Sequence, residues 1–171
     1  MKNYLLLASA ALVFTSCSTN KPSTNNSEKT DSVTTTSQDT TSKQSLIAKM
    51  EMKSAYKVGD SVHLKFTVYN PSDSAMKFCK WHTPFEPLMS KYLDVKDASG
   101  AEAAYQGPMA KRIMPPPADA YISIGAKDSA VVTVNLLKGY AITKPSKYTV
   151  TYQGGNISGL MVKESTSFEL R

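Results

Sequence analysis

The chain has 171 residues, which predicts one compact domain with additional tails. It contains 20 Lys and Arg against 14 Asp and Glu, a formal net charge of +6, but the basic residues are scattered and form no run. This distribution predicts a solvated basic surface and excludes an obvious nucleic-acid stripe. No zinc-finger spacing, glycine-rich phosphate loop or RNA-binding aromatic motif occurs.

Residues 1–16 have the pattern of a secretion leader: Lys2 is followed by an apolar run that is short for a permanent membrane span. The run ends in residues 14–17, Phe-Thr-Ser-Cys, which resembles the lipobox of bacterial lipoproteins. The resemblance implies cleavage before Cys17 and attachment of a diacyl lipid and palmitate to Cys17. Because Ser18 and not Asp follows, it also implies the outer membrane. The alternative is an ordinary secretory leader with a chance Cys.

Residues 17–45 are predicted to be a linker behind the lipidated Cys17. Within residues 18–44, Ser and Thr occupy 14 of 27 positions and Val33 is the only aliphatic side chain. Such a segment buries too little apolar area to offset the entropy of ordering it. We therefore expect a flexible tether between a lipid anchor and a folded domain.

Residues 46–171 change to an alternation of apolar and polar side chains, which is typical of half-buried strands. Strands are predicted at 46–52, 62–69, 75–81, 92–96, 102–105, 121–124, 130–137, 148–153, 160–163 and 166–170. The best candidate for a helical turn is 85–91. If seven to nine of these ten candidate segments are strands, the short strands and the turn signals between them predict an all-β fold, an immunoglobulin-like antiparallel β-sandwich. Trp81 on the third predicted strand agrees with this class of fold.

The residues that could carry chemistry offer no catalytic set. His63 is predicted to point to solvent, and His82 and Glu86 lie in a loop without the second His that a helical zinc site needs. Cys79 is expected to be a small, buried or half-buried side chain on a strand and not a nucleophile, which would need a nearby base and a lowered pKa. We predict no enzyme activity, no cofactor and no metal site. A remote alternative is a copper carrier, whose soft ligands would be His82, Met89, Met109 and Met114.

The run Trp-His-Thr-Pro-Phe-Glu at 81–86 resembles a Trp-Asn-Thr-Pro-(Phe/Leu)-Glu run in deuterolysin-like, lysine-specific metallo-endopeptidases. That run lies in their non-catalytic N-terminal domain. Further landmarks follow in the same order at 105–112, 115–121 and 139–150. The likeness implies a β-sandwich accessory domain over nearly all of 46–171. Those enzymes continue into a catalytic domain with a His-Glu-x-x-His helix, a motif that this sequence lacks, and His82 stands where Asn is usual.

Two interpretations of the 81–86 segment remain open. In the first, Trp81 and Phe85 fold back on the sandwich, and Glu86 pairs with Lys111 or Arg112. In the second, the segment and residues 111–114 form an exposed aromatic and basic patch that engages a partner. The residues predicted for partner binding are Trp81, His82, Thr83, Pro84, Phe85, Glu86, Lys111 and Arg112.

The leading functional hypothesis is therefore a non-catalytic, lipid-anchored binding module of the cell envelope. The resemblance implies that its partner is a secreted or envelope protease, which it would inhibit or assist as a pro-domain does. The alternative is a structural or surface-interaction lipoprotein in which the sandwich is a spacer or adhesive unit. Its other partner is the membrane, through the lipid, and no nucleic acid is expected.

Overall fold

Residues 45–171 are the part of the chain that the computed structural model describes. The predicted signal peptide, Cys17 and the predicted linker up to residue 44 lie outside these residues. No helix within 45–171 is long and apolar enough to cross a membrane.

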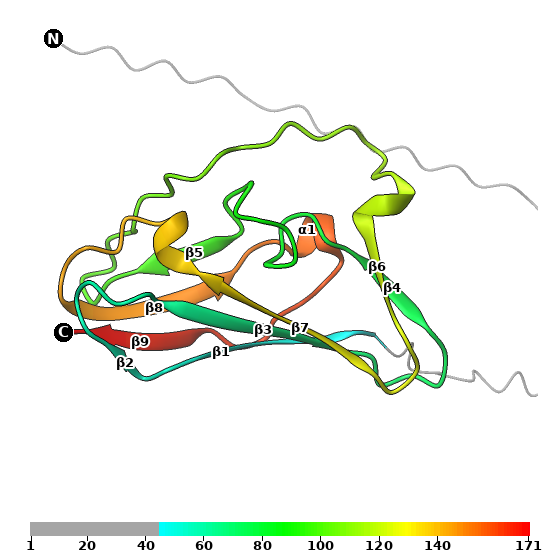
Figure 1. The fold of residues 1–171 in the computed structure, drawn as a ribbon, viewed down its shortest axis with the longest axis horizontal. Helices are drawn as coiled ribbons and strands as arrows, with labels where there is room; N and C mark the ends of the chain where they lie inside the picture. Colours follow the sequence, from blue (N-terminus) through cyan, green and yellow to red (C-terminus); the bar gives the residue numbers. More distant parts are fainter. Residues whose placement is uncertain (1–44) are drawn as a thin grey trace, which may run out of the picture. The chain divides into compact units, whose positions relative to one another are not determined.

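The described chain is built mainly from short strands (Figure 1). The strands are β1 (Ile47–Met52), β2 (Ala55–Tyr56), β3 (His63–Tyr69), β4 (Met76–Cys79), β5 (Leu93–Lys96), β6 (Tyr121–Ile124), β7 (Ser129–Asn135), β8 (Ser146–Tyr152) and β9 (Thr166–Leu170). The helical pieces are the 3-10 turns η1 (Ala118–Ala120) and η2 (Leu136–Lys138) and the single α-helical turn α1 (Gly155–Ser158).

The strands form two main sheets and one separate pair. One sheet has the order β1-β3-β7 and is antiparallel throughout. The other has the order β2-β9-β8-β5, in which only β2 runs parallel to its neighbour. Strands β4 and β6 pair with each other and carry the chain between the sheets. The long connection from β5 to η1 arches along one side of the sandwich (Figure 1).

The alternation in the sequence explains which faces meet. In β3, Leu64, Phe66 and Val68 are fully buried, and His63 is exposed as predicted. In β8, Tyr148, Val150 and Tyr152 point to the same core. A strand with period-two apolar residues buries one face against a second sheet, so these two patterns place the core between the sheets.

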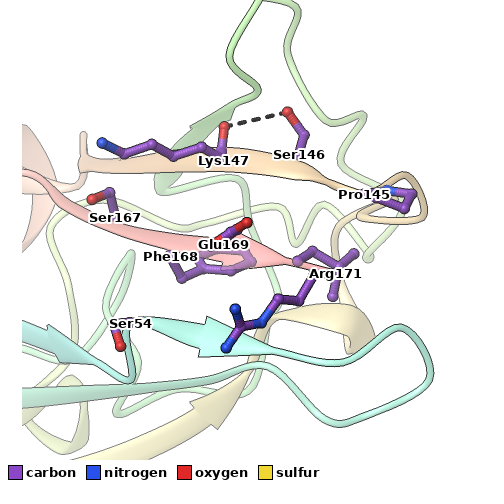
Figure 2. Close-up of a pocket in the computed structure, with 9 residues that line it drawn as sticks. Ser54, Pro145, Ser146, Lys147, Ser167, Phe168, Glu169 and Arg171 are labelled. Atoms are coloured by element: carbon purple, nitrogen blue, oxygen red, sulfur yellow. Dashed lines mark hydrogen bonds between the residues drawn. The ribbon is translucent and has the colours of Figure 1, made fainter.

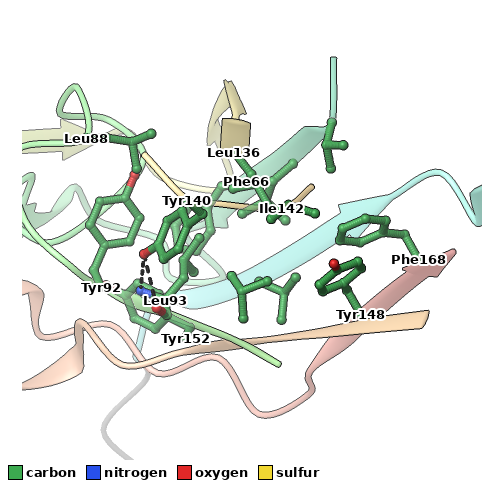
Figure 3. Close-up of a cluster of buried hydrophobic side chains, with 14 of the residues drawn as sticks. Phe66, Leu88, Tyr92, Leu93, Leu136, Tyr140, Ile142, Tyr148, Tyr152 and Phe168 are labelled. Carbon is green, nitrogen blue, oxygen red and sulfur yellow. Dashed lines mark hydrogen bonds between the residues drawn. The ribbon is translucent and has the colours of Figure 1, made fainter. Parts of the chain in front are cut away.

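Two tyrosine hydroxyls fix strands within this core. The hydroxyl of Tyr140 donates to the carbonyl of Leu93 (3.0 Å) and accepts from the N–H of Leu93 (3.1 Å), as Figure 3 shows. The hydroxyl of Tyr148 donates to the carbonyl of Lys144 (2.9 Å). A Tyr near the start of a late strand that binds backbone a few residues upstream is the tyrosine corner of immunoglobulin-like sandwiches. The predicted fold class is confirmed.

Several predicted elements differ from the structure. Residues 102–105 make only isolated bridges, Lys96 with Glu102 and Tyr105 with Tyr140. Residues 160–163 form no strand, because the chain leaves α1 through Gly159 in the left-handed conformation (φ 75°) and stays unpaired until β9. The helical turn predicted at 85–91 is absent, because Pro84 and Pro87 interrupt it. The turn α1 and the two-residue strand β2 were not predicted.

Two strand ends were also predicted too late. The strand expected to contain Trp81 ends at Cys79, so Trp81 lies in the turn that follows. Strand β7 ends at Asn135, whose side-chain oxygen accepts from the N–H of Leu137 and starts η2. Side-chain bonds of this kind compete with strand pairing.

Candidate functional site

The 81–86 segment is a compact turn directly after β4. The hydroxyl of Thr83 donates to the carbonyl of Lys80 (2.6 Å) and accepts from the N–H of Phe85 (3.2 Å). The N–H of Glu86 donates to the carbonyl of Thr83 (3.2 Å). His82 has a positive φ of 58°, which β-carbon-bearing residues rarely adopt and Asn tolerates best. The turn is therefore held by its own Thr83 side chain and contains one strained position.

Residues of the sandwich contact this turn and fix its position. The hydroxyl of Tyr152 donates to the carbonyl of His82 (2.9 Å), and Gly154 lies so close that a β-carbon there would be 2.0 Å from that carbonyl oxygen. The ring of Phe85 packs edge-on against Phe66 and Phe78, with centroids 6.2 and 5.3 Å apart. Only Gly fits at position 154, so the chain of α1 and the turn are packed backbone to backbone.

Of the eight residues predicted for partner binding, most form a scaffold. The buried ones are Trp81, Thr83, Pro84 and Glu86. The half-buried ones are His82, Phe85 and Arg112, and Lys111 is exposed. The structure thus agrees with the first interpretation of this segment, in which Trp81 and Phe85 fold back on the sandwich.

Arg112 brings the two sequence regions together. Its Nη2 lies 2.5 Å from Oε2 of Glu86, and its guanidinium carbon lies 4.8 Å from the centre of the Trp81 ring. Glu86 therefore pairs with Arg112 and not with Lys111. The Glu86 side chain is 9% exposed, so its charge needs this partner, and the cation over the indole face adds a favourable contact.

His82 titrates abnormally in this setting. Its partial burial lowers the pKa of the imidazole, and the neighbouring Arg112 guanidinium lowers it further. The carboxylate of Glu86 acts in the opposite direction with a smaller effect. Protonation of this imidazole therefore requires a lower pH than protonation of a free histidine.

The exposed part of the site is the 106–117 loop that Arg112 anchors. Three large apolar side chains on this loop face solvent: Met109 is 68% exposed, Ile113 84% and Met114 61%. Sequence analysis grouped Ile113 and Met114 with the patch but placed Met109 only in the copper alternative. The sequence feature that could have indicated the exposure of Met109 is that the apolar residues of this Pro-rich stretch follow neither a strand nor a helix period.

The base of the 106–117 loop is held by hydrogen bonds. The hydroxyl of Tyr105 donates to the carbonyls of Leu88 (2.7 Å) and Pro108 (2.9 Å). The N–H of Ala110 donates to the carbonyl of Met89 (2.8 Å). Together with Arg112, these contacts fix the loop on both sides of Lys111 while its apolar side chains project outward.

A separate hollow of the described domain lies along β8 and β9. Its volume is about 700 Å³. Figure 2 shows the side chains that line it, among them Lys147, Glu169 and Arg171, which are exposed and make no ion pair with one another. Within residues 45–171, no group of three His, Cys, Asp or Glu side chains could hold a metal ion. Of the residues named for copper, Met109 and Met114 are exposed and His82 is half-buried.

The solved structures that this chain resembles share little sequence identity with it. A Listeria innocua β-glucosidase shares 13% identity with a TM-score of 0.38, over 74% of this chain and 16% of that chain. The CARDB domain of a Pyrococcus furiosus protein shares 12% identity with a TM-score of 0.36, over 74% and 88%. The alkylpurine DNA glycosylase AlkC of Pseudomonas fluorescens shares 15% identity with a TM-score of 0.37, over 74% and 30%. This chain thus spans a small part of the length of the two enzymes.

No curated protein matches the sequence. A family model described as an immunoglobulin-like domain matches residues 49–164, which is more than half of the chain. The matched range covers β2 to β8 and α1 entirely, including the 81–86 turn and the 106–117 loop. The chain belongs to the immunoglobulin-like domain family.

Proposed function

We propose that this protein is a non-catalytic binding module of the cell envelope that captures a protein partner through the 106–117 loop. The observation that carries this proposal is the exposure of Met109, Ile113 and Met114 on one loop whose base is fixed. Folded proteins rarely place several large apolar side chains together in solvent unless another surface covers them.

The contacts that restrain the loop support a role in binding a partner. Arg112 and Tyr105 already restrict the loop before any partner arrives, so less entropy is lost on association. Met side chains adapt to an irregular surface, and Ile113 supplies a branched anchor. With Lys111 exposed beside them, the partner surface that fits is an apolar pocket with an acidic rim.

The location in the envelope is supported by the sequence. The lipobox-like residues 14–17 favour a lipid on Cys17, the Ser18 that follows favours the outer membrane, and a linker of Ser and Thr separates both from the domain. We expect Cys17→Ser to move the protein from the membrane fraction to the soluble fraction. An unchanged membrane fraction would remove the lipid anchor from the proposal.

A protease is the partner that the sequence favours. The 81–86 run and the landmarks after it resemble the accessory domain of lysine-specific metallo-endopeptidases. We therefore propose that the module acts on a secreted or envelope protease as an inhibitor or a pro-domain-like assistant. Its scaffold, the Trp81–Arg112–Glu86 contact, would set the position of the loop against the enzyme.

The binding proposal is tested by affinity capture with the full-length chain from solubilised envelope. Ile113→Asp places a charge at the most exposed residue of the apolar set, and Val58→Asp is the matched control at an apolar residue 56% exposed elsewhere. We expect one partner to be captured by the wild type and by Val58→Asp and to be lost with Ile113→Asp. Equal capture by all three proteins would contradict the loop as the binding surface.

The protease connection needs its own readout. The full-length chain is added to a lysine-specific metallo-endopeptidase of the same cells, and cleavage of a Lys-containing peptide is followed. The proposal expects a change in the cleavage rate that Ile113→Asp abolishes and Val58→Asp preserves. If the cleavage rate does not change at tens of micromolar of the chain, the protein is a binding module whose partner is not this protease. If the protein is only a spacer or adhesive unit, the capture experiment also shows no partner that depends on the loop.

A further inference from the structure

A second interaction surface is the free edge of β1. This strand is the outer member of the β1-β3-β7 sheet and pairs only with β3. Among residues 45–171, no backbone hydrogen bond joins residues 47–51 to anything on the other side. A six-residue edge with unpaired N–H and C=O groups is a template for another strand unless its side chains oppose pairing.

Space for such a strand lies next to this edge. A groove of about 830 Å³ is lined by residues 45–51, which include most of β1, and by Pro71, residue 159 and residues 161–164. Ile47, 44% exposed, and Met161, 73% exposed, give the groove an apolar rim. The groove therefore combines the unpaired backbone groups of β1 with exposed apolar side chains.

The side chains of β1 are arranged so that a second β1 fits. Lys49 and Glu51 are exposed on the outer face, whereas Ala48, Met50 and Met52 face inward and are buried or half-buried. Residues directly opposite in an antiparallel pair point to the same face. A two-fold axis at Met50 places Lys49 of each copy opposite Glu51 of the other and keeps the inner face apolar.

The neighbouring registers are disfavoured by charge. Moving the axis to Lys49 puts two lysines opposite each other, and moving it to Glu51 puts two glutamates opposite each other. A shift by a single register step would set outward residues against inward ones. Among the registers centred on residues 49, 50 and 51, the one about Met50 therefore satisfies both the charges and the faces of the strand.

We propose that two copies of this chain associate by antiparallel pairing of their β1 strands about Met50, which joins two three-stranded sheets into one of six strands. The contact is two-fold and self-complementary, as most homodimer contacts are. It is also small, so the dimer is weak and forms at high local concentration.

The test uses purified full-length chains in detergent with a mild oxidant. In this pairing the two residues 50 are opposite, with β-carbons about 5 Å apart, so Met50→Cys is expected to form a covalent dimer. The matched control is Val131→Cys, an exposed residue on β7 at the opposite edge of the same sheet. Both proteins also share Cys17 and the buried Cys79, so any dimer formed through these two residues is the same in each. We expect at least tenfold more dimer from Met50→Cys; equal yields would overturn the proposal.

Charge reversal then tests the register. In the Met50→Cys background, Lys49→Glu alone and Glu51→Lys alone are each expected to reduce the dimer at least fivefold. An equimolar mixture of these two proteins restores complementary pairs and is expected to recover the yield. Near-UV circular dichroism of each variant checks that it is folded. Yields that do not respond to these reversals would refute pairing about Met50.

Discussion

Arg112 links the scaffold of the site to its exposed loop. It belongs to the 106–117 loop, yet its charge is paired with the buried carboxylate of Glu86 and its guanidinium covers Trp81. One side chain therefore joins two segments that are far apart in the sequence. Its neighbour Lys111 has neither contact and is exposed.

Arg112→Ala is expected to destabilise the domain by about 3 kcal/mol, because it leaves Glu86 buried without a partner. For a domain of this size that corresponds to a fall in the melting temperature of roughly 10 °C. Lys111→Ala is the control and is expected to change stability by less than about 0.5 kcal/mol. Thermal unfolding followed by circular dichroism measures both; equal effects would mean that the Glu86 pair contributes no more than an exposed charge.

His82 predicts a pH dependence. Its pKa in the folded domain lies below the ordinary value of 6.5, so the unfolded chain binds the proton more tightly. The stability from neutral His82 is complete above that ordinary value and is lost as the pH falls below it toward the lowered pKa. Between about pH 7.5 and pH 5, the wild type should therefore lose more unfolding free energy than His82→Asn.

The same substitution should be tolerated at neutral pH, because Asn accepts the positive φ of 58° at this position more readily than His. Chemical denaturation at several pH values gives both quantities. His63 is exposed and unchanged in the two proteins. Parallel pH profiles for the wild type and His82→Asn would show that the histidine is not coupled to folding.

At the scale of elements, Asn70 joins two turns that are distant in the sequence. Its amide nitrogen donates to the carbonyls of Ser74 (2.8 Å), Ile124 (3.1 Å) and Gly125 (2.8 Å), and its side-chain oxygen accepts from Ser72. It is fully buried. The Asn70 side chain thus links the β3–β4 turn to the β6–β7 turn, in addition to the backbone bonds from Asn70 to Asp128 and from Lys127 to Ser72.

Asn70→Ala is expected to cost about 3 kcal/mol, since several buried backbone groups lose their partner. Asn135→Ala is the matched control: Asn135 is half-buried and its side chain caps η2 with one backbone bond, a contribution of about 1 kcal/mol. Urea unfolding of both variants measures the difference. A similar loss of unfolding free energy in the two variants would mean that water molecules replace Asn70 as hydrogen-bond donors to the three carbonyls.

How much of the fold the sequence reveals depends on the range of the interactions. The strands β1, β3, β6 and β9 were predicted nearly to the residue, because their alternating side chains record a face buried along the whole strand. Residues 160–163 have a similar apolar pattern but form no strand, since pairing there depends on a neighbour that the local sequence does not reveal. The two-residue β2 is too short to leave any period.

The candidate site was partly predictable for the same reason. The pairing of Glu86 with one of two adjacent basic residues was foreseen from sequence, but the choice of Arg112 over Lys111 depends on where the loop returns. The turn is held at His82 by Tyr152 and Gly154, which lie some seventy positions later in the chain, and Trp81 packs in a cluster with Ala120 and Ile157. The exposure of Ile113 and Met114 was one of two interpretations of the sequence, and the sequence did not decide between them, because apolar residues usually lie inside.

At the scale of the whole molecule, the described domain is stabilised by its core and not by covalent links. Cys79 is its only cysteine, and it is buried and unpaired. Residues 45–171 are enough to bury a continuous core without a disulfide. We expect the melting temperature to be the same with and without a reducing agent. A fall of several degrees on reduction would reveal an intermolecular disulfide and contradict the burial of Cys79.

The single Trp of the sequence has a practical consequence. Trp81 lies beneath Arg112 at the foot of the 106–117 loop, within a small cluster formed with Cys79 and Ala120. Its indole emission is sensitive to the charge above it, so the loop carries a built-in optical reporter. Any event that lifts or clamps the loop, whether a partner, a proton on His82 or loss of the Glu86 pair, can be followed by intrinsic fluorescence on the unlabelled protein.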